Sequence, residues 1–316
     1  MVISGQRRWR RSFPTRPMGA AVVGAVVALA LSGCGMPGGR LGARASDSWT
    51  HTYPLNKNGE VTIANANGRI EVEGVDGSTL TVQAERIARG ATEQLARDLL
   101  PRIPIEEHAT PDFVSIETKR MSGFLIGASY EVRYKVKVPR MATIRATTVN
   151  GGVSVTGMSG RVIAQTTNGG VLATEIAGAL EARSVNGGLR IQFASLTGAG
   201  VDLRTVNGGV HVALPDTAKA TVSATWVNGG INLSGLPFEV TDQGRRRFEG
   251  RLNGGGTSID LKTVNGGITL GTRLDDSVRR RGRGWDEVFG VGEKPDQPAE
   301  APDQPAEKPE SDHPVP

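Results

Sequence analysis

The stretch Ile144-Arg-Ala-Thr-Thr-Val-Asn150-Gly-Gly-Val-Ser-Val155 contains the pattern that decides the fold. Apolar or small residues alternate with polar ones up to an Asn-Gly-Gly triplet, and the alternation resumes after it. The pattern recurs at intervals of 18, 18, 21 and 21 residues, and a last copy follows 37 residues later. The triplets begin at Asn150, Asn168, Asn186, Asn207, Asn228 and Asn265, and an Asn-Gly-Arg version begins at Asn67. A period near 20 residues is typical of a solenoid.

Alternation with period two, filled by β-branched residues, predicts a strand on each side of every triplet. Asn-Gly is also a hairpin signal, so a stack of hairpins is the rival interpretation. The run after the triplet is short, because Val153-Ser-Val155 is soon followed by Gly157, whereas hairpin arms should match in length. We therefore expect a coil that turns at each triplet and stacks its rungs about 4.8 Å apart. A further triplet at Asn253 is out of phase and is interpreted as a loop.

The predicted fold is all-β: a single-domain β-solenoid, or β-helix, with rungs of about 18–21 residues. Glycine is expected at each corner because it adopts a positive φ without steric cost. The asparagine at one fixed corner position is expected to form a ladder of stacked amides. The predicted ladder consists of Asn67, Asn150, Asn168, Asn186, Asn207, Asn228 and Asn265. The pattern leaves the hand of the coil open.

Valine precedes the asparagine in most copies, at Val149, Val185, Val206, Val227 and Val264. If the alternation continues to the corner, these side chains point outward and form an apolar stripe, which is typical of an interface. The alternative, which we favour from sequence, is that the corner breaks the alternation and buries the valines.

The segment between the first copy and residue 142 departs from the repeat. Residues 91–100 predict a short inserted helix that ends at Pro101, with Leu95, Leu99 and Leu100 on its apolar side. Short runs of alternation predict strands at 114–116 and 132–138. We expect the helix to cap one end of the solenoid, since open sheet edges need protection.

Residues 1–33 predict a signal peptide, with a basic start and an apolar run at 18–31 that is too short to span a bilayer. The run leads to Leu31-Ser-Gly-Cys34, and the chain has one cysteine. This resembles the bacterial lipobox, which implies a lipid on Cys34 and a membrane anchor. The export route stays open, because Arg10-Arg11-Ser-Phe13 resembles part of a twin-arginine signal. The expected location is the cell envelope, with the outer membrane or cell surface favoured.

The rest of the chain divides into a lipidated tether at 34–48, the solenoid domain at 49–273 and a tail at 274–316. The tail is first basic and then acidic and proline-rich, a composition that favours disorder. The formal net charge of +5 comes from the five arginines of residues 1–33, since the remainder carries 32 basic and 32 acidic residues. A nucleic-acid partner is therefore not expected.

Three passages resemble a bacterial putative-adhesin family, a domain of unknown function with β-strand repeats. They are residues 59–74, residues 136–140 where they lead into the repeats, and residues 250–267. The family often has an acidic residue after Asn-Gly, whereas this chain has a second glycine in its core rungs, which disfavours calcium binding there. The resemblance implies a β-helical cell-envelope protein.

No catalytic residue, metal site or cofactor is predicted. The four histidines are scattered, and no carboxylate cluster has the spacing of metal ligands. Two columns of outward-pointing charged side chains, one acidic and one basic, are the best candidate for a binding face, and Glu181 belongs to the acidic column. The residues that we predict for the face are Arg183, Asp202, Arg204, His211, Asp260 and Lys262. We expect one rung to contain Asp202, Arg204 and His211. A simpler explanation of the columns is that their charges pair with each other and keep the rod soluble.

The sequence thus favours a lipid-anchored, non-catalytic solenoid, an adhesin or scaffold, that presents a polar face to an envelope protein or polysaccharide. One alternative is a carbohydrate-active β-helix enzyme that uses Asp202 and Asp260. Another is an envelope-stress module that oligomerises through the valine stripe. The oligomeric state is left open by the sequence.

Overall fold

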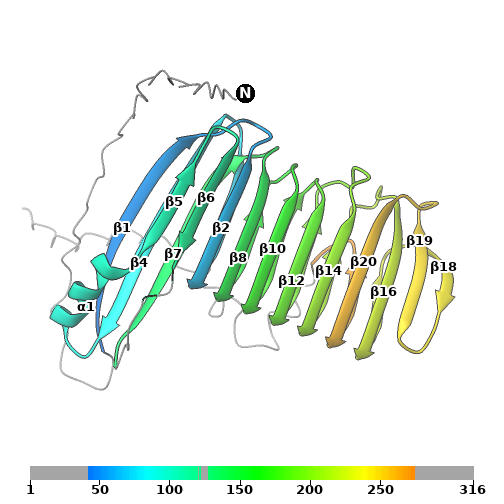
Figure 1. Cartoon of the computed structure of the whole chain (residues 1–316). Coiled ribbons are helices and arrows are strands. Elements are labelled where there is room, and N and C mark those ends of the chain that lie inside the picture. Colours follow the sequence, from blue (N-terminus) through cyan, green and yellow to red (C-terminus); the bar gives the residue numbers. More distant parts are fainter. Residues whose placement is uncertain (1–41, 120, 122–126, 275–316) are drawn as a thin grey trace, which may run out of the picture.

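The protein is described by a computed structural model of residues 42–119, 121 and 127–274. The predicted signal peptide, Cys34 and nearly all of the predicted tail lie outside these residues. Two sheets face each other and form a rod (Figure 1).

The strands of sheet A are, in spatial order, β1 (Ala43–Pro54), β4 (Thr79–Gly90), β7 (Ser129–Pro139), β3 (Ile70–Val75), β9 (Val153–Thr156), β11 (Val171–Ile176), β13 (Leu189–Phe193), β15 (Val210–Ala213), β21 (Ile268–Gly271) and β17 (Ile231–Ser234). The strands of sheet B are β18 (Phe238–Gln243), β19 (Arg247–Leu252), β16 (Ala220–Asn228), β20 (Thr257–Asn265), β14 (Val201–Asn207), β12 (Leu180–Asn186), β10 (Val162–Asn168), β8 (Thr143–Asn150), β2 (Glu60–Asn67), β6 (Phe113–Thr118) and β5 (Ile105–Ala109).

Each repeat contributes one strand to each sheet, and the Asn-Gly corner joins the two. Strand β8, for example, lies in sheet B and pairs in parallel with β10, whereas β9 lies in sheet A and pairs in parallel with β11. The two strands that flank a triplet therefore do not pair with each other. This confirms the β-solenoid and excludes the stack of hairpins.

The rungs do not follow one another in sequence order at the C-terminal end. Strand β20 pairs with β14 on one side and with β16 on the other, so the last repeat is inserted before the fifth. Figure 1 shows this as the orange strand β20 between the green β14 and the yellow-green β16. The expectation that each rung stacks on its sequence neighbour is wrong at this point.

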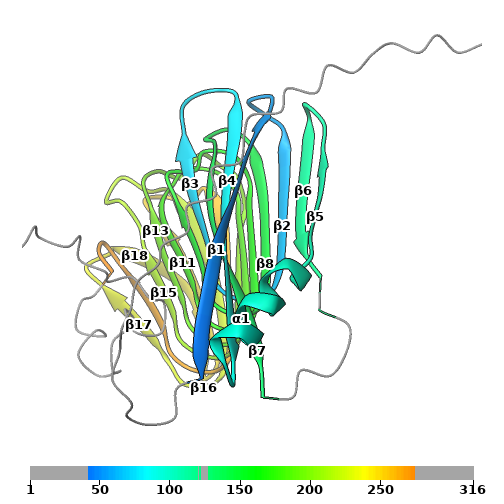
Figure 2. The ribbon, with the colours of Figure 1, turned by 90° about the vertical axis from the view of Figure 1, so that its left-hand side faces the viewer.

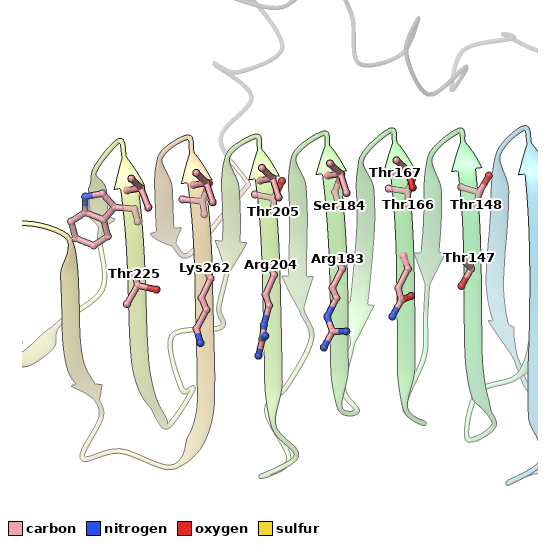
Figure 3. Close-up of a pocket in the computed structure, with 17 residues that line it drawn as sticks. Thr147, Thr148, Thr166, Thr167, Arg183, Ser184, Arg204, Thr205, Thr225 and Lys262 are labelled. Carbon is pink, nitrogen blue, oxygen red and sulfur yellow. The ribbon is translucent and has the colours of Figure 1, made fainter.

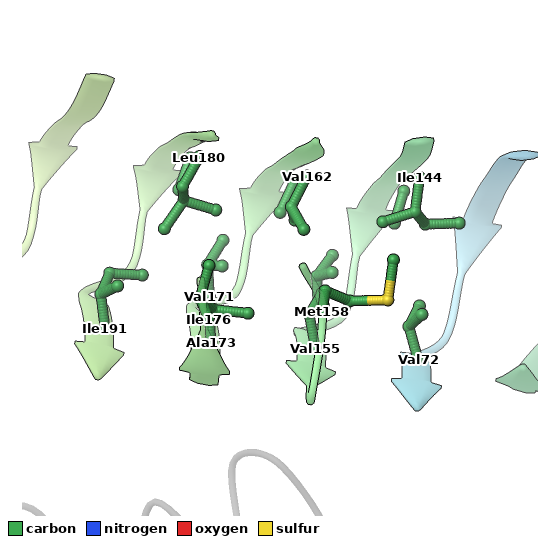
Figure 4. Packing of buried hydrophobic residues seen from close by; sticks show 14 of the residues in the cluster. Val72, Ile144, Val155, Met158, Val162, Val171, Ala173, Ile176, Leu180 and Ile191 are labelled. Carbon is green, nitrogen blue, oxygen red and sulfur yellow. The ribbon is translucent and has the colours of Figure 1, made fainter. Parts of the chain in front are cut away.

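The core lies between the two sheets and is built from the inward residues of the alternation. Figure 4 shows layers of aliphatic side chains from both sheets, among them Ile144, Val162 and Leu180 from sheet B, which are 0–1% exposed. Met158 follows β9 and fills space between rungs. Each rung thus buries its apolar side chains against its neighbours, which is the main stabilising contribution in such a stack.

The N-terminal end of the rod is closed by the segment that departs from the repeat (Figure 2). Helix α1 (Glu93–Leu99) continues into the 3-10 turn η1 (Leu100–Arg102) and packs against β1 and β4. Thr92 caps the helix by accepting a hydrogen bond from the amide of Leu95 at 3.2 Å. The helix and the strands at 114–116 and 132–138 are confirmed, but Leu95 is 38% exposed while Ala96 is buried in its place.

The folded body begins earlier than the sequence indicated. Strand β1 starts at Ala43 and pairs with β4 along its whole length, from Ala43 opposite Gly90 to Pro54 opposite Thr79. The expected boundary at residue 49 is therefore wrong. Residues 43–48 are small or polar and carry no apolar alternation, so only the backbone pairing with β4 makes them a strand.

Candidate functional site

The outer face of sheet B carries two charged columns in exact register. Glu181 pairs with Asp202, which pairs with Asp260, and two residues later Arg183, Arg204 and Lys262 align in the same way. Parallel in-register pairing places equivalent residues of neighbouring rungs beside each other. We call the first set the acidic column and the second set the cationic column. The sequence predicted both sets and their register.

The two columns form ion pairs across and along the strands. Arg204 Nε donates to Asp202 Oδ1 at 2.7 Å, and Arg183 lies 3.2 Å from Glu181 and 3.8 Å from Asp202. The hydrogen bond to Asp202 raises the pKa of Arg204, so its guanidinium stays charged. Pairs of this exposed kind contribute little to stability, and their regular spacing along the rod is their notable property.

The valines that precede the corner are exposed, which corrects the favoured expectation that they are buried. Val185, Val206, Val227 and Val264 are 39–45% exposed, and Val149 is half-buried. The alternation continues to the last residue before the corner, because the preceding Thr, Ser or, in β16, Trp occupies the inward position. We call the four exposed residues the valine column.

The cationic column and the valine column together line a groove of about 620 Å³ on the outer face of sheet B (Figure 3). It crosses the strands β8, β10, β12, β14, β20 and β16, so it runs along the rod rather than along a strand. Its lining consists of Thr147, Thr148, Gln165, Thr166, Thr167, Arg183, Ser184, Val185, Arg204, Thr205, Val206, Thr225, Trp226, Val227, Lys262, Thr263 and Val264. None of the described residues that line the groove carries a carboxylate, although the acidic column runs parallel to it.

The corner beside the groove is held by two rows of hydrogen bonds. In the first row each asparagine after Asn67 donates from its side-chain amide to the side-chain oxygen of the asparagine on the preceding rung, for example Asn186 Nδ2 to Asn168 Oδ1 at 2.9 Å. The complete row, in spatial order, is Asn67, Asn150, Asn168, Asn186, Asn207, Asn265 and Asn228. The predicted ladder therefore forms with all seven members, and only the order of the last two differs.

The second row is formed by inward-pointing residues two positions before each asparagine. Hydroxyl groups at the inward position before the valine donate to a glycine carbonyl of the previous rung, as Thr205 does to Gly187 at 2.7 Å. Trp226 occupies this position in β16, the last of the six strands that the groove crosses; it is 7% exposed and belongs to the lining of the groove. Trp226 was not singled out from the sequence, where its size among threonines and a serine was the available signal.

Glycine at the corner is required by close packing between rungs. A Cβ on Gly187 would lie 1.9 Å from the carbonyl oxygen of Gly169, and one on Gly169 would lie 2.1 Å from that of Gly151. The φ of Gly169 is 157°, so a conformation disfavoured for other residues adds to the constraint there. Both effects fix the distance between rungs, and hence the spacing of the groove side chains.

His211 does not join the charged columns. It lies on β15 in sheet A, beside Arg190 of β13 and Thr269 of β21, whereas Asp202 and Arg204 lie on β14 in sheet B. The rung is shared, as expected, but the two sheets turn their outer faces in opposite directions. His211 is therefore removed from the candidate face, and the remaining five residues stay together.

Neither a grouping of metal ligands nor a membrane-spanning helix is found among the described residues. In the ranges 42–119 and 127–274, and at residue 121, no three His, Cys, Asp or Glu side chains are grouped as they would be around a metal ion. The same residues contain no helix that is long and apolar enough to cross a bilayer. The predicted lipid attachment at Cys34 falls outside them.

Residues 112–271, just over half of the chain, match the family described as Toastrack DUF4097. Among solved structures, a putative cell adhesion protein from Clostridium sporogenes is similar, with 10% identity and a TM-score of 0.43 over 71% of this chain and 99% of that one. A putative adhesin from Bacteroides fragilis shows 8% identity and a TM-score of 0.29 over 71% and 96%. A putative lipid binding protein from Parabacteroides distasonis shows 10% identity and a TM-score of 0.26 over 72% and 97%. No curated protein matches the sequence.

Proposed function

The chain belongs to the Toastrack DUF4097 family, and from this premise we propose that it is a non-catalytic binding protein of the cell envelope that holds an extended anionic polymer in its groove. The polymer class that we propose is an acidic polysaccharide. The observation that carries the proposal is the cationic column, which supplies one cation from each of three adjacent rungs to a groove whose described lining residues include no carboxylate.

The direction of the groove supports a linear ligand. Adjacent strands are about 4.8 Å apart, so six strands span roughly 24 Å along the rod. Arg183, Arg204 and Lys262 repeat at that spacing in the lining of the groove, and the valine column adds an apolar surface two residues further along each strand. A chain with regularly spaced carboxylates can contact several rungs at once, and each contact is individually weak because the cations are exposed.

The alternative of a carbohydrate-active enzyme has less support. Asp202, one of the two carboxylates considered for it, is engaged by the guanidinium groups of Arg204 and Arg183. Asp260 lies beside Asp202 in the same column, and neither residue lines the groove. Glycoside hydrolysis uses two carboxyl groups that flank the bond to be cleaved, and two side chains outside the groove do not flank a sugar held in it.

The proposed location rests on the first 34 residues. A signal peptide at 1–33 and a lipid on Cys34 would tether the solenoid to a membrane through residues 35–42, with the groove free to meet envelope polymers. Replacing Cys34 by serine should release the protein from the membrane fraction of cells. Retention of Cys34→Ser in that fraction would contradict the anchor without affecting the groove.

The experiment that tests the groove is calorimetric titration of the protein with alginate, a polyuronate, and with neutral dextran. We expect saturable binding of alginate alone, weakened by salt because exposed charges are screened. The double variant Arg204→Gln/Lys262→Gln should bind roughly tenfold more weakly, as expected for the loss of two exposed charge contacts. Lys135→Gln/Lys137→Gln removes two exposed cations from the outer face of sheet A and serves as the matched control. Equal loss in both variants, or equal binding of dextran, would contradict the proposal.

An exposed valine column also favours a second candidate, a protein partner or second copy that docks on the same groove. The four valines give an apolar strip bordered by threonines, which is a common composition for an interface core. This candidate corresponds to the oligomerising module considered from sequence.

A further inference from the structure

The two sheets end at different places at the C-terminal end of the rod. In the described residues sheet A ends with β17, the sheet A strand of the last rung. Sheet B continues past β16, its own strand of that rung, with the antiparallel strands β19 and β18. Figure 1 shows β19 and β18 as the yellow strands at the end of the rod. Sheet B thus extends two strands beyond sheet A.

The overhang leaves apolar side chains that no strand of the described residues opposes. Phe238 and Val240 of β18 pair with Leu252 and Gly250 of β19, so they belong to the inward face, yet Val240 is 52% exposed. In β17, Ile231 and Leu233 are only half-buried, whereas their neighbours in β21, Ile268 and Leu270, are 1% and 0% exposed. The core is therefore complete at β21 and incomplete at β17.

Along the edge of β17 that faces away from β21, backbone amide groups point outward from the sheet. The carbonyl of Gly230 accepts from the amide of Ile268 at 2.8 Å, so it points to β21. Backbone groups alternate in direction along a strand, and the amides of Ile231 and Leu233 therefore point away from β21, along the open edge. An additional strand would satisfy these groups and would cover the inward face of β18 at the same time.

We propose that residues 285–291 of this chain, Trp-Asp-Glu-Val-Phe-Gly-Val, add as a strand to the edge of β17 and close this end of the solenoid. The described chain leaves sheet A after β21, the strand next to β17, and reaches Leu274. The ten residues 275–284 span up to about 33 Å when extended, and the new strand position is about 10 Å from β21. The length of the connection is therefore ample.

The composition of the segment fits the surface. Trp285 and Phe289 are the only aromatic residues after Gly271, and they come with two valines in seven residues. Asp286 and Glu287 provide two negative charges, and the turn between β18 and β19 carries the exposed Arg245 and Arg246. Attachment through the same chain gives a high effective concentration, which favours this segment over a second copy.

Amide hydrogen exchange of the full chain, resolved by NMR, tests the proposal. In the wild type the amides of Ile231 and Leu233 should be protected, and in Trp285→Ser/Phe289→Ser they should exchange roughly tenfold or more faster. The amide of Asn232 points to β21 and should stay protected in both proteins, which shows that the variant is folded. Val315→Ser, a change in the distal tail, is the control and should exchange as the wild type does.

Each other outcome overturns the proposal. Fast exchange of Ile231 and Leu233 in the wild type would show that nothing covers the edge. Protection that rises with protein concentration would assign the edge to a second copy. Protection that persists in the double variant at every concentration would assign it to another part of the chain. None of these results depends on the groove or on its ligand.

Discussion

Asn265 Nδ2 donates a hydrogen bond to Asn207 Oδ1 at 2.8 Å across 58 residues of sequence, while Asn228, which is closer in sequence, lies on the far side of Asn265. The last repeat has been inserted between its two predecessors. Strand β19 pairs with one edge of β16, and the chain then crosses to the other edge to form β20.

The crossing is made by the out-of-phase triplet at Asn253, which the sequence assigned to a loop. Asn253 has a φ of 50° and donates from Nδ2 to the carbonyls of Asp216 and Ala218, at 2.9 and 2.8 Å. A Cβ on Gly256 would lie 2.5 Å from the carbonyl of Lys219, so the turn passes directly against the residue that precedes β16. The loop is therefore held at the point where the chain crosses from one edge of β16 to the other.

Replacing Asn207 by alanine should destabilise the fold by about 1–2 kcal/mol, because it removes one hydrogen bond to Asn186 and one from Asn265. Asn67→Ala, at the end of the ladder, loses one bond and should cost about half as much. Urea unfolding measures both, with Asn232→Ala, an exposed asparagine outside the ladder, as the control. Equal effects in all three variants would show that the ladder adds no stability.

Gly187→Ala should destabilise the protein by about 3 kcal/mol or more, since its Cβ would lie 1.9 Å from the carbonyl oxygen of Gly169 and the rungs must separate. Gly230→Ala is the control: it changes the second glycine of a later corner, where a Cβ would have no atom within 4 Å. Thermal unfolding of the two variants should therefore differ clearly. Similar melting temperatures would mean that the close contact between rungs is not restrictive.

Stability should fall as the pH rises from about 10 to about 12, in part because of Tyr134. Burial raises the pKa of Tyr134 to about 12, against an ordinary value near 10, and its hydroxyl contacts Thr118 Oγ1 at 2.6 Å. Because the pKa of Tyr134 is higher in the folded state than in the unfolded state, the protonated hydroxyl contributes about 2–3 kcal/mol of stability below pH 10. This contribution is lost as the pH rises to the pKa of the folded state.

Urea unfolding at several pH values in this window measures the effect. Burial and Glu107 also raise the pKa of Tyr53, so Tyr134→Phe should reduce the loss of stability and not abolish it. The comparison is made between the two proteins at each pH, because lysine and arginine titration affects both. Parallel pH profiles would exclude a contribution of Tyr134.

Val206→Lys separates the two candidate uses of the groove. A charge in the middle of the valine column should disperse any oligomer or protein complex that buries it, whereas binding of a polyanion should be unchanged or stronger. Light scattering coupled to size exclusion gives the mass, and alginate titration gives the affinity. A monomeric wild type at high concentration would count against self-association through this column.

Much of the candidate site could be predicted because, in a solenoid, residues at equivalent positions of successive repeats lie side by side in a column. Once Glu181, Asp202 and Asp260 occupy equivalent positions in repeats, parallel pairing places them in a row, and the same holds for the cations. The exposure of Val206 was not predicted, because nothing in the sequence states where alternation stops at a corner. The assignment of His211 to the charged face was wrong because one rung contributes strands to both sheets, and His211 lies on the sheet A strand.

The sequence by itself determined the rung, its period, the asparagine ladder and the residues that point inward, since all of these follow from local alternation and from the corner chemistry of Asn-Gly. Only the tertiary structure decided which rungs are neighbours, that residues 43–48 form a strand, and that sheet B extends beyond sheet A. These features depend on backbone pairing between segments that are distant in sequence. Backbone hydrogen bonding is nearly independent of side-chain identity, so it leaves little trace in the amino-acid pattern.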